Sequence, residues 1–140
     1  LMAARIIGDK GVFEFIKAAT YLKKIKFNAN FLLVGDIDFD NPSAIKKSLV
    51  EGWKKNKNLN YFKNQKKIEL LIKNSSIVVL PSYREGFPKI LMESAAVGRP
   101  VITTNVPGCK DAVINNITGI VIPKKNYLAL AKAIIKIFKK

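Results

Sequence analysis

The sequence predicts an α/β domain built on a mainly parallel sheet of about six strands with helices on its flanks. Short apolar runs of strand length alternate along the whole chain with segments in which apolar residues recur at helical spacing. The length of 140 residues and the hydrophobic content of 49% suit one domain with a sizeable core. We therefore expect a single domain over residues 1–140.

The strands are expected where apolar residues form short runs bounded by turn residues. In order, these are residues 1–4, 30–34, 59–62, 77–80, 101–104 and 120–122. No run approaches the roughly 20 apolar residues of a membrane-spanning helix. The first residues also lack the features of a signal peptide, so they are interpreted as a strand already under way.

The helices are expected between these strands. The first and last have one apolar face each, formed by Val12, Phe15, Ile16, Ala19 and Leu22, and by Tyr127, Ala131, Ile134, Ile135 and Phe138. Pro42-Ser43 predicts the start of a short helix in the polar segment 36–58, and Ile68, Leu71 and Ile72 indicate another. A further helix follows Pro88 and ends near Gly98, before Arg99-Pro100.

The composition excludes some kinds of catalytic and metal site, and the net positive charge has two interpretations. With no histidine and one cysteine, a tetrahedral zinc site and a histidine-dependent triad are excluded. Cys109 cannot form an internal disulfide, which favours a reducing compartment. The net charge of +15 is interpreted mainly as solvated helix faces. The alternative is attraction to nucleotide phosphates, an anionic membrane surface or nucleic acid.

The most informative segment is PSYREGFPKILMESAAVGRPVIT, residues 81–103. It predicts a buried strand, a tight turn and a helix, with Glu85 at the turn and Glu93, eight residues later, inside the helix. Gly86 permits unusual backbone conformations, and Pro88 suits a helix start. Because a helix N-terminus favours phosphate, two carboxylates beside it suggest a sugar-nucleotide site.

Several charged residues should converge on one crevice. Arg5 and Lys10 follow the first predicted strand, Asp36 the second and Glu85 the fourth. Ligands of open parallel sheets bind beyond the carboxyl ends of the strands, near the reversal in strand order. We therefore expect these side chains to open onto a shared cavity.

The motifs EGFPKILME, SAAVGRPVITTNVPGCKD, NNITGIVIP and AARIIGDKG lie in one order across nearly the whole chain. In this the chain resembles the C-terminal, donor-binding domain of retaining GT-B glycosyltransferases of family 4 (group 1). Within that family it is most similar to bacterial enzymes of surface-polysaccharide and lipid-linked glycan synthesis. The resemblance implies a Rossmann-like sheet and a nucleotide diphosphate sugar as donor, with a UDP-sugar expected first.

The resemblance also implies residue roles. Arg5 and Lys10 would hold the diphosphate and stabilise its charge as the sugar leaves. Glu85 would accept hydrogen bonds from sugar hydroxyls, and Glu93 from the ribose. The remaining donor contacts would be backbone N–H groups at Gly86, Phe87 and Lys89. Members of the family generally need no bound metal, so no cofactor is expected.

Two departures from the family limit these expectations. The loop 106–111 contains Gly108-Cys109 where many relatives have two glycines, and Asp111 where glutamate is common. The N-terminal acceptor domain of the GT-B architecture is expected to be absent from these residues. The isolated chain should therefore bind donor weakly and transfer little or no sugar.

Other chemistry is disfavoured. Asp36, Asp38 and Asp40 lack the glycine and glutamate of an EF-hand loop and are interpreted as a polar loop over the crevice. Cys109 has no histidine to activate it and is expected to pack in a loop. Tyr61 and Phe62 could stack on a base, although core positions are favoured.

Two rival functions stay open. One is a basic, non-catalytic module that binds polyanions such as nucleic acid, supported by charge alone. The other is a phosphorylase or epimerase of the same architecture, which the lack of histidine disfavours. Our first hypothesis is a cytoplasmic transferase with peripheral contact at the inner membrane face, a glycan or lipid-linked acceptor, and no nucleic acid partner.

Overall fold

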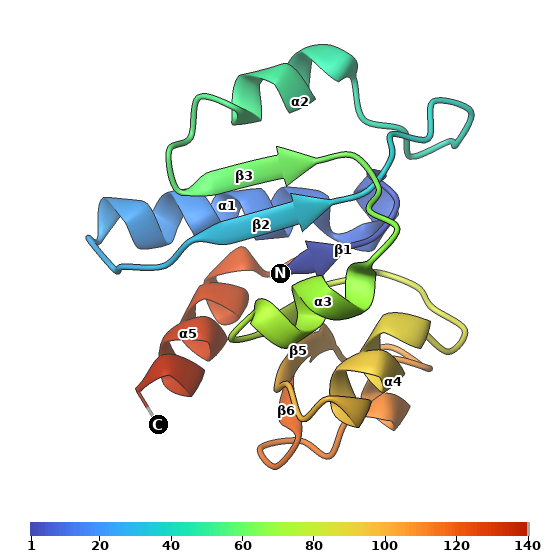
Figure 1. The fold of residues 1–140 in the computed structure, drawn as a ribbon, viewed down its shortest axis with the longest axis vertical. Helices are drawn as coiled ribbons and strands as arrows, with labels where there is room; N and C mark the ends of the chain where they lie inside the picture. Colours follow the sequence, from blue (N-terminus) through green and yellow to red (C-terminus); the bar gives the residue numbers. More distant parts are fainter. Residues whose placement is uncertain (140) are drawn as a thin grey trace.

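The computed structural model describes residues 1–139, in which helices cover both faces of parallel β-sheet (Figure 1). The strands are β1 (Met2–Ala3), β2 (Phe31–Val34), β3 (Leu59–Phe62), β4 (Val78–Leu80), β5 (Val101–Thr104) and β6 (Gly119–Ile122). The helices are α1 (Val12–Lys24), α2 (Lys47–Trp53), α3 (Ile68–Asn74), α4 (Lys89–Ala96) and α5 (Tyr127–Phe138), with 3-10 turns η1 (Gly8–Lys10) and η2 (Lys110–Ala112). The predicted fold class is confirmed.

The strands form two parallel three-stranded sheets that meet at the first residue. Their orders are β1-β2-β3 and β4-β5-β6. The amino group of Leu1 donates to the Ile77 carbonyl at 2.8 Å, and the Val79 N–H donates to the Leu1 carbonyl at 2.8 Å. The order across both sheets is therefore β3-β2-β1-β4-β5-β6. It reverses between β1 and β4, which is where ligands of such folds bind.

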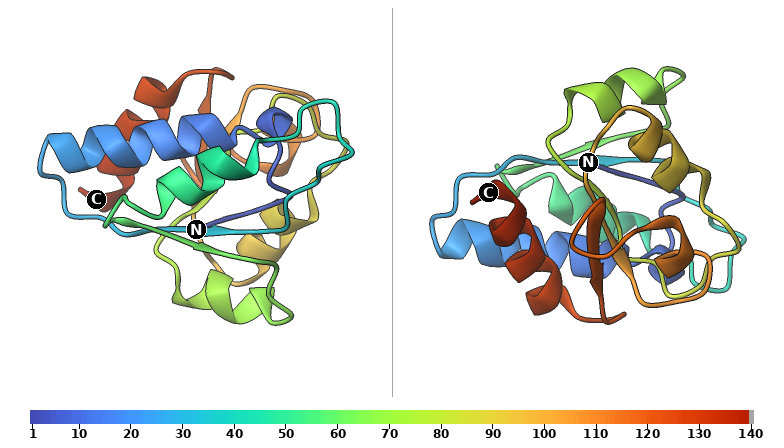
Figure 2. Two further views of the ribbon diagram at one scale, coloured as in Figure 1. Left: turned by 90° about the horizontal axis from the view of Figure 1, so that it is seen from above. Right: turned by 90° about the horizontal axis from the view of Figure 1, so that it is seen from below.

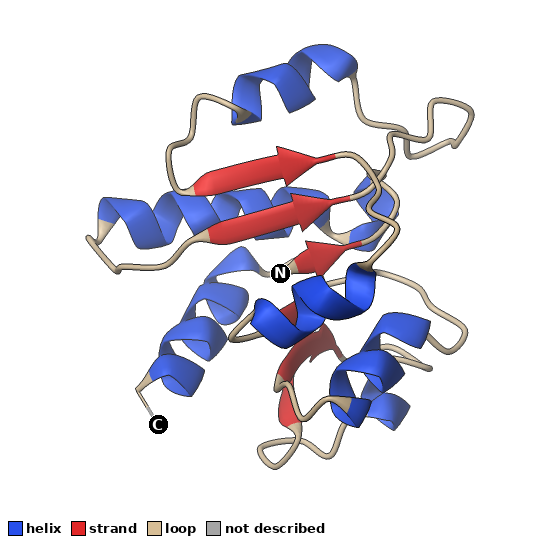
Figure 3. Ribbon diagram, viewed as in Figure 1, coloured by secondary structure: helices blue, strands red, loops and turns tan. Residues whose placement is uncertain are grey.

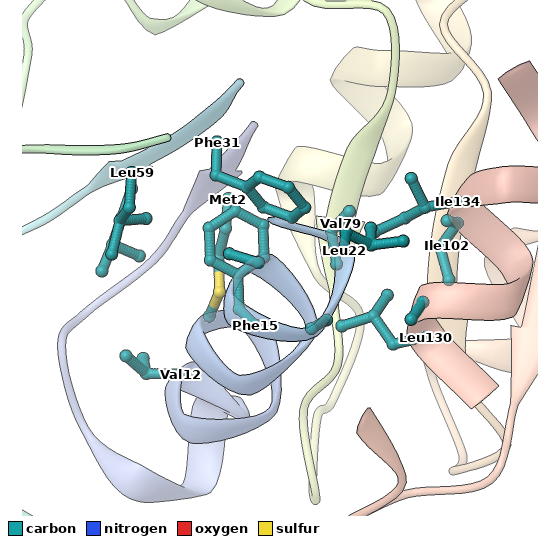
Figure 4. Packing of buried hydrophobic residues seen from close by; sticks show 14 of the residues in the cluster. Met2, Val12, Phe15, Leu22, Phe31, Leu59, Val79, Ile102, Leu130 and Ile134 are labelled. Carbon is teal, nitrogen blue, oxygen red and sulfur yellow. The ribbon is translucent and has the colours of Figure 1, made fainter. Parts of the chain in front are cut away.

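Figure 2 shows the layers of the molecule, with α1, α2 and α5 on one side of the strands and α3 and α4 on the other. Figure 3 shows the strands running between these two helical layers. Successive strand residues face opposite sides, so Met2, Leu33 and Val79 join the core under α1 and α5. In that core, Phe15 meets the edge of Phe31 at a ring-centroid distance of 5.2 Å (Figure 4).

The two long helices follow the predicted pattern to different degrees. Four of the five predicted residues of α1 are buried, namely Val12, Phe15, Ala19 and Leu22. In α5 the buried residues are Leu130, Ala131, Ala133 and Ile134. The predicted face was partly wrong because the Phe138 ring packs edge-on against Phe27 near the surface and stays 48% exposed.

The predicted helix start at Pro42-Ser43 is wrong. The Ser43 N–H and hydroxyl both donate to Asn41 Oδ1 at 2.9 Å, which closes a turn there. The Ser43 carbonyl accepts from the Gly8 N–H at 2.7 Å. This long-range bond ties the segment to η1, in the first crossover, which is the connection from β1 to β2. Helix α2 begins only at Lys47.

Candidate functional site

A polar cleft of about 430 Å³ lies where β1 and β4 end. The segment after β1 and the segment after β4 supply most of its walls. The lining residues are Arg5, Ile7, Asp9, Lys10, Asn41, Arg84, Glu85 and Gly86. The structure thus brings together Arg5, Lys10, Glu85 and Gly86, as the sequence predicted. Asp36 does not line the cleft, contrary to expectation; its Oδ1 accepts from the Asn64 N–H at 3.3 Å.

An ion pair joins the two walls of the cleft. Lys10 Nζ lies 2.5 Å from Glu85 Oε1, and the two side chains are 20% and 10% exposed. Residues that are 75 positions apart in the chain are held in contact here. Because the pair is largely shielded from water, its attraction is stronger than that of a surface pair.

The outer wall carries a second, more exposed pair. Arg5 Nη1 donates to Asp38 Oδ2 at 2.8 Å, with the Arg5 side chain 59% exposed. Asp38 therefore acts on the site through Arg5, in the polar loop that the sequence predicted over the crevice. Screening by water makes this pair easy to exchange for another anion.

The sequence interpretation missed three polar lining residues, Asp9, Asn41 and Arg84, and the apolar Ile7. Asn41 reaches the cleft because the turn described above folds its segment back over η1. Arg84 and Asp9 are direct neighbours in sequence of Glu85 and Lys10, and this adjacency was the available signal. Together the lining side chains comprise three cations and two carboxylates.

Backbone contacts fix the two crossover segments against each other. The Tyr83 N–H donates to the Asp9 carbonyl at 2.8 Å. The hydroxyl of Ser82, which is fully buried, donates to the carbonyls of Asp9 and Arg84, each at 3.1 Å. The relative positions of Lys10 and Glu85 are therefore set by the main chain as well as by their ion pair.

Two glycines allow close approaches behind the cleft. A Cβ on Gly11, whose φ is 76°, would lie 2.0 Å from the Pro81 carbonyl oxygen. A Cβ on Gly108, whose φ is 80°, would lie 1.8 Å from the Gly86 carbonyl oxygen. Only glycine fits both the left-handed conformation and the missing space at these positions. By contrast, a Cβ on Gly86 would meet nothing within 4 Å.

A buried hydrogen bond links α1 to the segment after β4. Tyr83 donates its hydroxyl to Glu14 Oε2 at 2.7 Å, and Glu14 is only 8% exposed. Lys125 Nζ lies 5.0 Å from the centre of the Tyr83 ring. Burial, followed by the hydrogen bond to Glu14, raises the pKa of Tyr83 above its usual value of 10. Tyr83 therefore remains a neutral donor at physiological pH.

The start of α4 offers open backbone donors beside the cleft. Pro88 occupies the N-cap position with ψ 115°, so the helix itself begins at Lys89. Within residues 1–139, the N–H groups of Gly86, Phe87 and Lys89 donate no hydrogen bond. Unpaired N–H groups at a helix N-terminus favour an anion.

The outer residues of the motif do not line the cleft. The side chain of Phe87 is 57% exposed. Glu93 Oε1 forms an ion pair with Lys89 Nζ at 3.3 Å across one turn of α4, and the Glu93 side chain is 24% exposed. No contact joins Glu93 to Arg5, Lys10 or Glu85 in the described residues, so its role stays a prediction.

The loop after β5 supports the site from behind. Cys109 is fully buried, and burial is the main cause that raises the pKa of its thiol. Asp111 accepts from the Gly108 N–H at 3.2 Å through Oδ2, which stabilises the turn that carries Gly108. Cys109 therefore packs in a loop, as expected, and is unsuited to act as a nucleophile.

The aromatic residues of β3 do not reach the cleft. Tyr61 donates its hydroxyl to the Gly35 carbonyl at 2.9 Å. The ring of Phe62 is 52% exposed at the end of the strand. Neither residue lines the cleft.

A second hollow of about 430 Å³ lies at the amino ends of β2 and β4. Asparagine, serine and apolar side chains line it, and no charged side chain does. A phosphate would find no cationic side chain there, which favours the cleft at the other edge as the site for an anionic ligand.

Within residues 1–139, no helix has the length and hydropathy needed to span a membrane. Among the same residues, no group of three acidic, cysteine or histidine side chains is placed to hold a metal ion.

Comparison with known proteins places this chain in a family. The family model described as glycosyl transferases group 1 matches residues 1–140. The chain belongs to this family.

Two curated relatives are bacterial transferases. One is the N,N'-diacetylbacillosaminyl-diphospho-undecaprenol alpha-1,3-N-acetylgalactosaminyltransferase of Campylobacter jejuni, 37% identical over 96% of this chain and 34% of its own. The other is the capsular polysaccharide biosynthesis glycosyltransferase CapM of Staphylococcus aureus, 32% identical over 95% of this chain and 34% of its own. The chain thus spans about a third of the length of these relatives and is related to bacterial polysaccharide and lipid-linked glycan transferases.

A solved structure with the same fold is that of Anabaena Alr3699/HepE in complex with UDP. Its TM-score is 0.85 at 19% identity, over 99% of this chain and 38% of that one. At this identity the likeness concerns the fold, which is that of GT-B glycosyltransferases.

Proposed function

We propose that the cleft between β1 and β4 binds the diphosphate of a nucleotide diphosphate sugar, with a UDP-sugar as the first expectation. The chain would then be the donor-binding part of a retaining glycosyltransferase of family 4. The observation that carries this proposal is the convergence of Arg5, Lys10 and Arg84 on one cleft beside the open N–H groups at the start of α4.

Two further findings support this ligand class. A diphosphate needs several charge-assisted donors, and the cleft supplies guanidinium, ammonium and backbone groups together. The related fold of Alr3699/HepE has been solved with UDP and with UDP-glucose. The C. jejuni relative is named as an N-acetylgalactosaminyltransferase, which is a transferase of a sugar.

The proposed mechanism assigns each residue a role. Arg5 and Lys10 stabilise the negative charge that develops on the diphosphate as the bond to the sugar breaks. Glu85 accepts hydrogen bonds from sugar hydroxyls, and Glu93 from the ribose. Backbone N–H groups of Gly86, Phe87 and Lys89 contact the phosphates or the sugar, whereas Pro88 has no N–H group. Because these groups supply the positive charge, we propose that no resident metal is required.

The role of the whole protein is also a proposal. The acceptor would be a growing polysaccharide or lipid-linked glycan, bound by residues outside this chain, at the cytoplasmic face of a bacterial membrane. We propose displacement at the face from which the leaving group departs, so that configuration is retained. The isolated chain is expected to bind donor without appreciable transfer.

Calorimetric titration of UDP and UDP-glucose tests the proposal. We expect Lys10→Gln to weaken UDP binding about tenfold or more, because one charge-assisted contact to phosphate is lost. The matched control is Lys17→Gln, which removes the same charge from an exposed position on α1. Equal UDP affinity in both variants and the original chain would reject this site.

The rival polyanion hypothesis is tested with the same samples. Salt-sensitive binding of single-stranded RNA that UDP does not displace would support it. Displacement of RNA by UDP, with loss of both in Lys10→Gln, would support the nucleotide site instead.

A further inference from the structure

We propose that Arg84 is a phosphate-binding residue of the cleft and contacts the diphosphate of a nucleotide-sugar donor. This inference rests on the proposed function, because it assumes a phosphorylated ligand. It adds to Arg5 and Lys10 a third cation that comes from the opposite wall of the cleft.

The three cations of the cleft differ in their partners. Lys10 is paired with Glu85 at 2.5 Å, and Arg5 is paired with Asp38 at 2.8 Å. Within residues 1–139, the Arg84 guanidinium has neither a salt bridge nor a hydrogen bond. A phosphate that approaches Lys10 or Arg5 therefore competes with a carboxylate already paired to that cation, whereas at Arg84 it meets no competing ion pair.

The main chain holds Arg84 in place while its side chain stays available. The Arg84 carbonyl accepts from the buried hydroxyl of Ser82 at 3.1 Å. The Ser82 carbonyl in turn accepts from Thr104 Oγ1, and both residues are buried. Because these hydrogen bonds hold its backbone in place, Arg84 loses less conformational freedom on binding than a residue on a free loop would.

The surroundings of Arg84 suit a phosphate. Gly86, two residues later, leaves open space where a side chain would stand, and its N–H is unpaired within the described residues. Arginine can donate two parallel hydrogen bonds to phosphate oxygens, whereas lysine acts as a point charge. The Arg84 guanidinium and the N–H groups at the start of α4 therefore bind the diphosphate from one side of the cleft, opposite Lys10.

The proposal is tested by calorimetry with UDP, UMP and uridine on four proteins: the original chain, Arg84→Gln, Arg84→Lys and Lys63→Gln. Lys63 is the matched control, since it is exposed at the same sheet edge, just after β3, but lies outside the cleft. We expect Arg84→Gln to weaken UDP binding about tenfold, with smaller losses for UMP and none for uridine. Arg84→Lys should recover part of the affinity, and Lys63→Gln should match the original chain.

The outcomes separate this proposal from the proposed function. If the original chain binds UDP and Arg84→Gln binds it equally well, the role of Arg84 is overturned and the nucleotide site stands. If the original chain binds no UDP, both are overturned. A loss of uridine binding equal to the loss for UDP would indicate a distorted fold and would also overturn a phosphate contact. Thermal melting of each variant checks folding independently.

Discussion

The two crossovers beside the point where the strand order reverses use the same strand–loop–helix plan in different ways. After β1, the N-terminus of α1 is sealed, because Gly11 packs directly against the Pro81 carbonyl. After β4, the N-terminus of α4 is open, because a Cβ on Gly86 would meet nothing and the preceding N–H groups are unpaired within the described residues. Both helices begin at the carboxyl edge of the sheet, but the backbone of Pro81 packs against the start of α1, whereas the space around Gly86 before α4 is open.

The two segments therefore supply different groups to the cleft. The first crossover contributes side-chain charge through Arg5 and Lys10, and its helix serves as a rigid support. The segment after β4 contributes the backbone N–H groups at the start of α4 together with the side chains of Arg84 and Glu85. Dinucleotide-binding folds place a glycine-rich phosphate loop at the first crossover, and the absence of that motif here agrees with a sealed α1.

The largest effect is predicted for a substitution that disrupts the close approach between Gly11, after β1, and Pro81, after β4. Gly11→Ala should lower the free energy of unfolding by roughly 2–5 kcal/mol, because it combines a left-handed backbone with a clash against Pro81. Gly86→Ala is the matched control, with open space around the new methyl group. Urea unfolding of both variants measures the difference.

Similar losses of stability for these two variants would contradict the contrast between a sealed and an open helix start. A sharper test measures UDP binding by the Gly86→Ala variant. If Gly86→Ala is stable but binds UDP less tightly than the original chain, the open space beside Gly86 is occupied by the nucleotide.

A smaller effect is predicted for the hydrogen bond that links the two crossovers. Tyr83→Phe should lower the free energy of unfolding by about 1–3 kcal/mol, because the buried Glu14 carboxylate loses its donor. Tyr21→Phe is the control, since its ring packs on Tyr127 but its hydroxyl makes no hydrogen bond within the described residues. Chemical denaturation of the two variants should separate them, and equal stabilities would count against a linking role for Tyr83.

The same variant should change the response to alkaline pH. The raised pKa of Tyr83 keeps its proton in the folded state at pH values where the unfolded chain loses it. Stability from this group is therefore complete below pH 10 and falls as pH rises further. Tyr83→Phe should show a shallower decline above pH 10. Tyr61, whose pKa burial also raises, remains in both proteins and does not affect the comparison.

Much of the fold follows from local patterns. The runs NFLLV and IVVL are apolar enough to require burial on both faces, and they became β2 and β4. The Pro42-Ser43 helix start failed because the Asn41 side chain and the bond from Gly8 to Ser43 compete with helix formation. That second bond joins residues 35 positions apart and has no signal in a local pattern.

The site was predictable where topology alone decides position. Arg5, Lys10 and Glu85 meet because the carboxyl ends of neighbouring parallel strands share one edge. Asp36 follows β2, one strand further from the reversal, and it turns to Asn64 instead. Arg84 and Asn41 were missed because their inclusion depends on loop conformations fixed by Ser82 and Ser43.

The most direct test of the account is an amide chemical-shift titration of the 15N-labelled chain with UDP-glucose. We expect the largest changes at residues 5–11 and 84–90, on both walls of the cleft. We expect little change around the hollow at the amino edge, which has no charged side chain and includes Asn30 and Ser76. Changes concentrated at that hollow, with none at Lys10 or Gly86, would contradict this expectation.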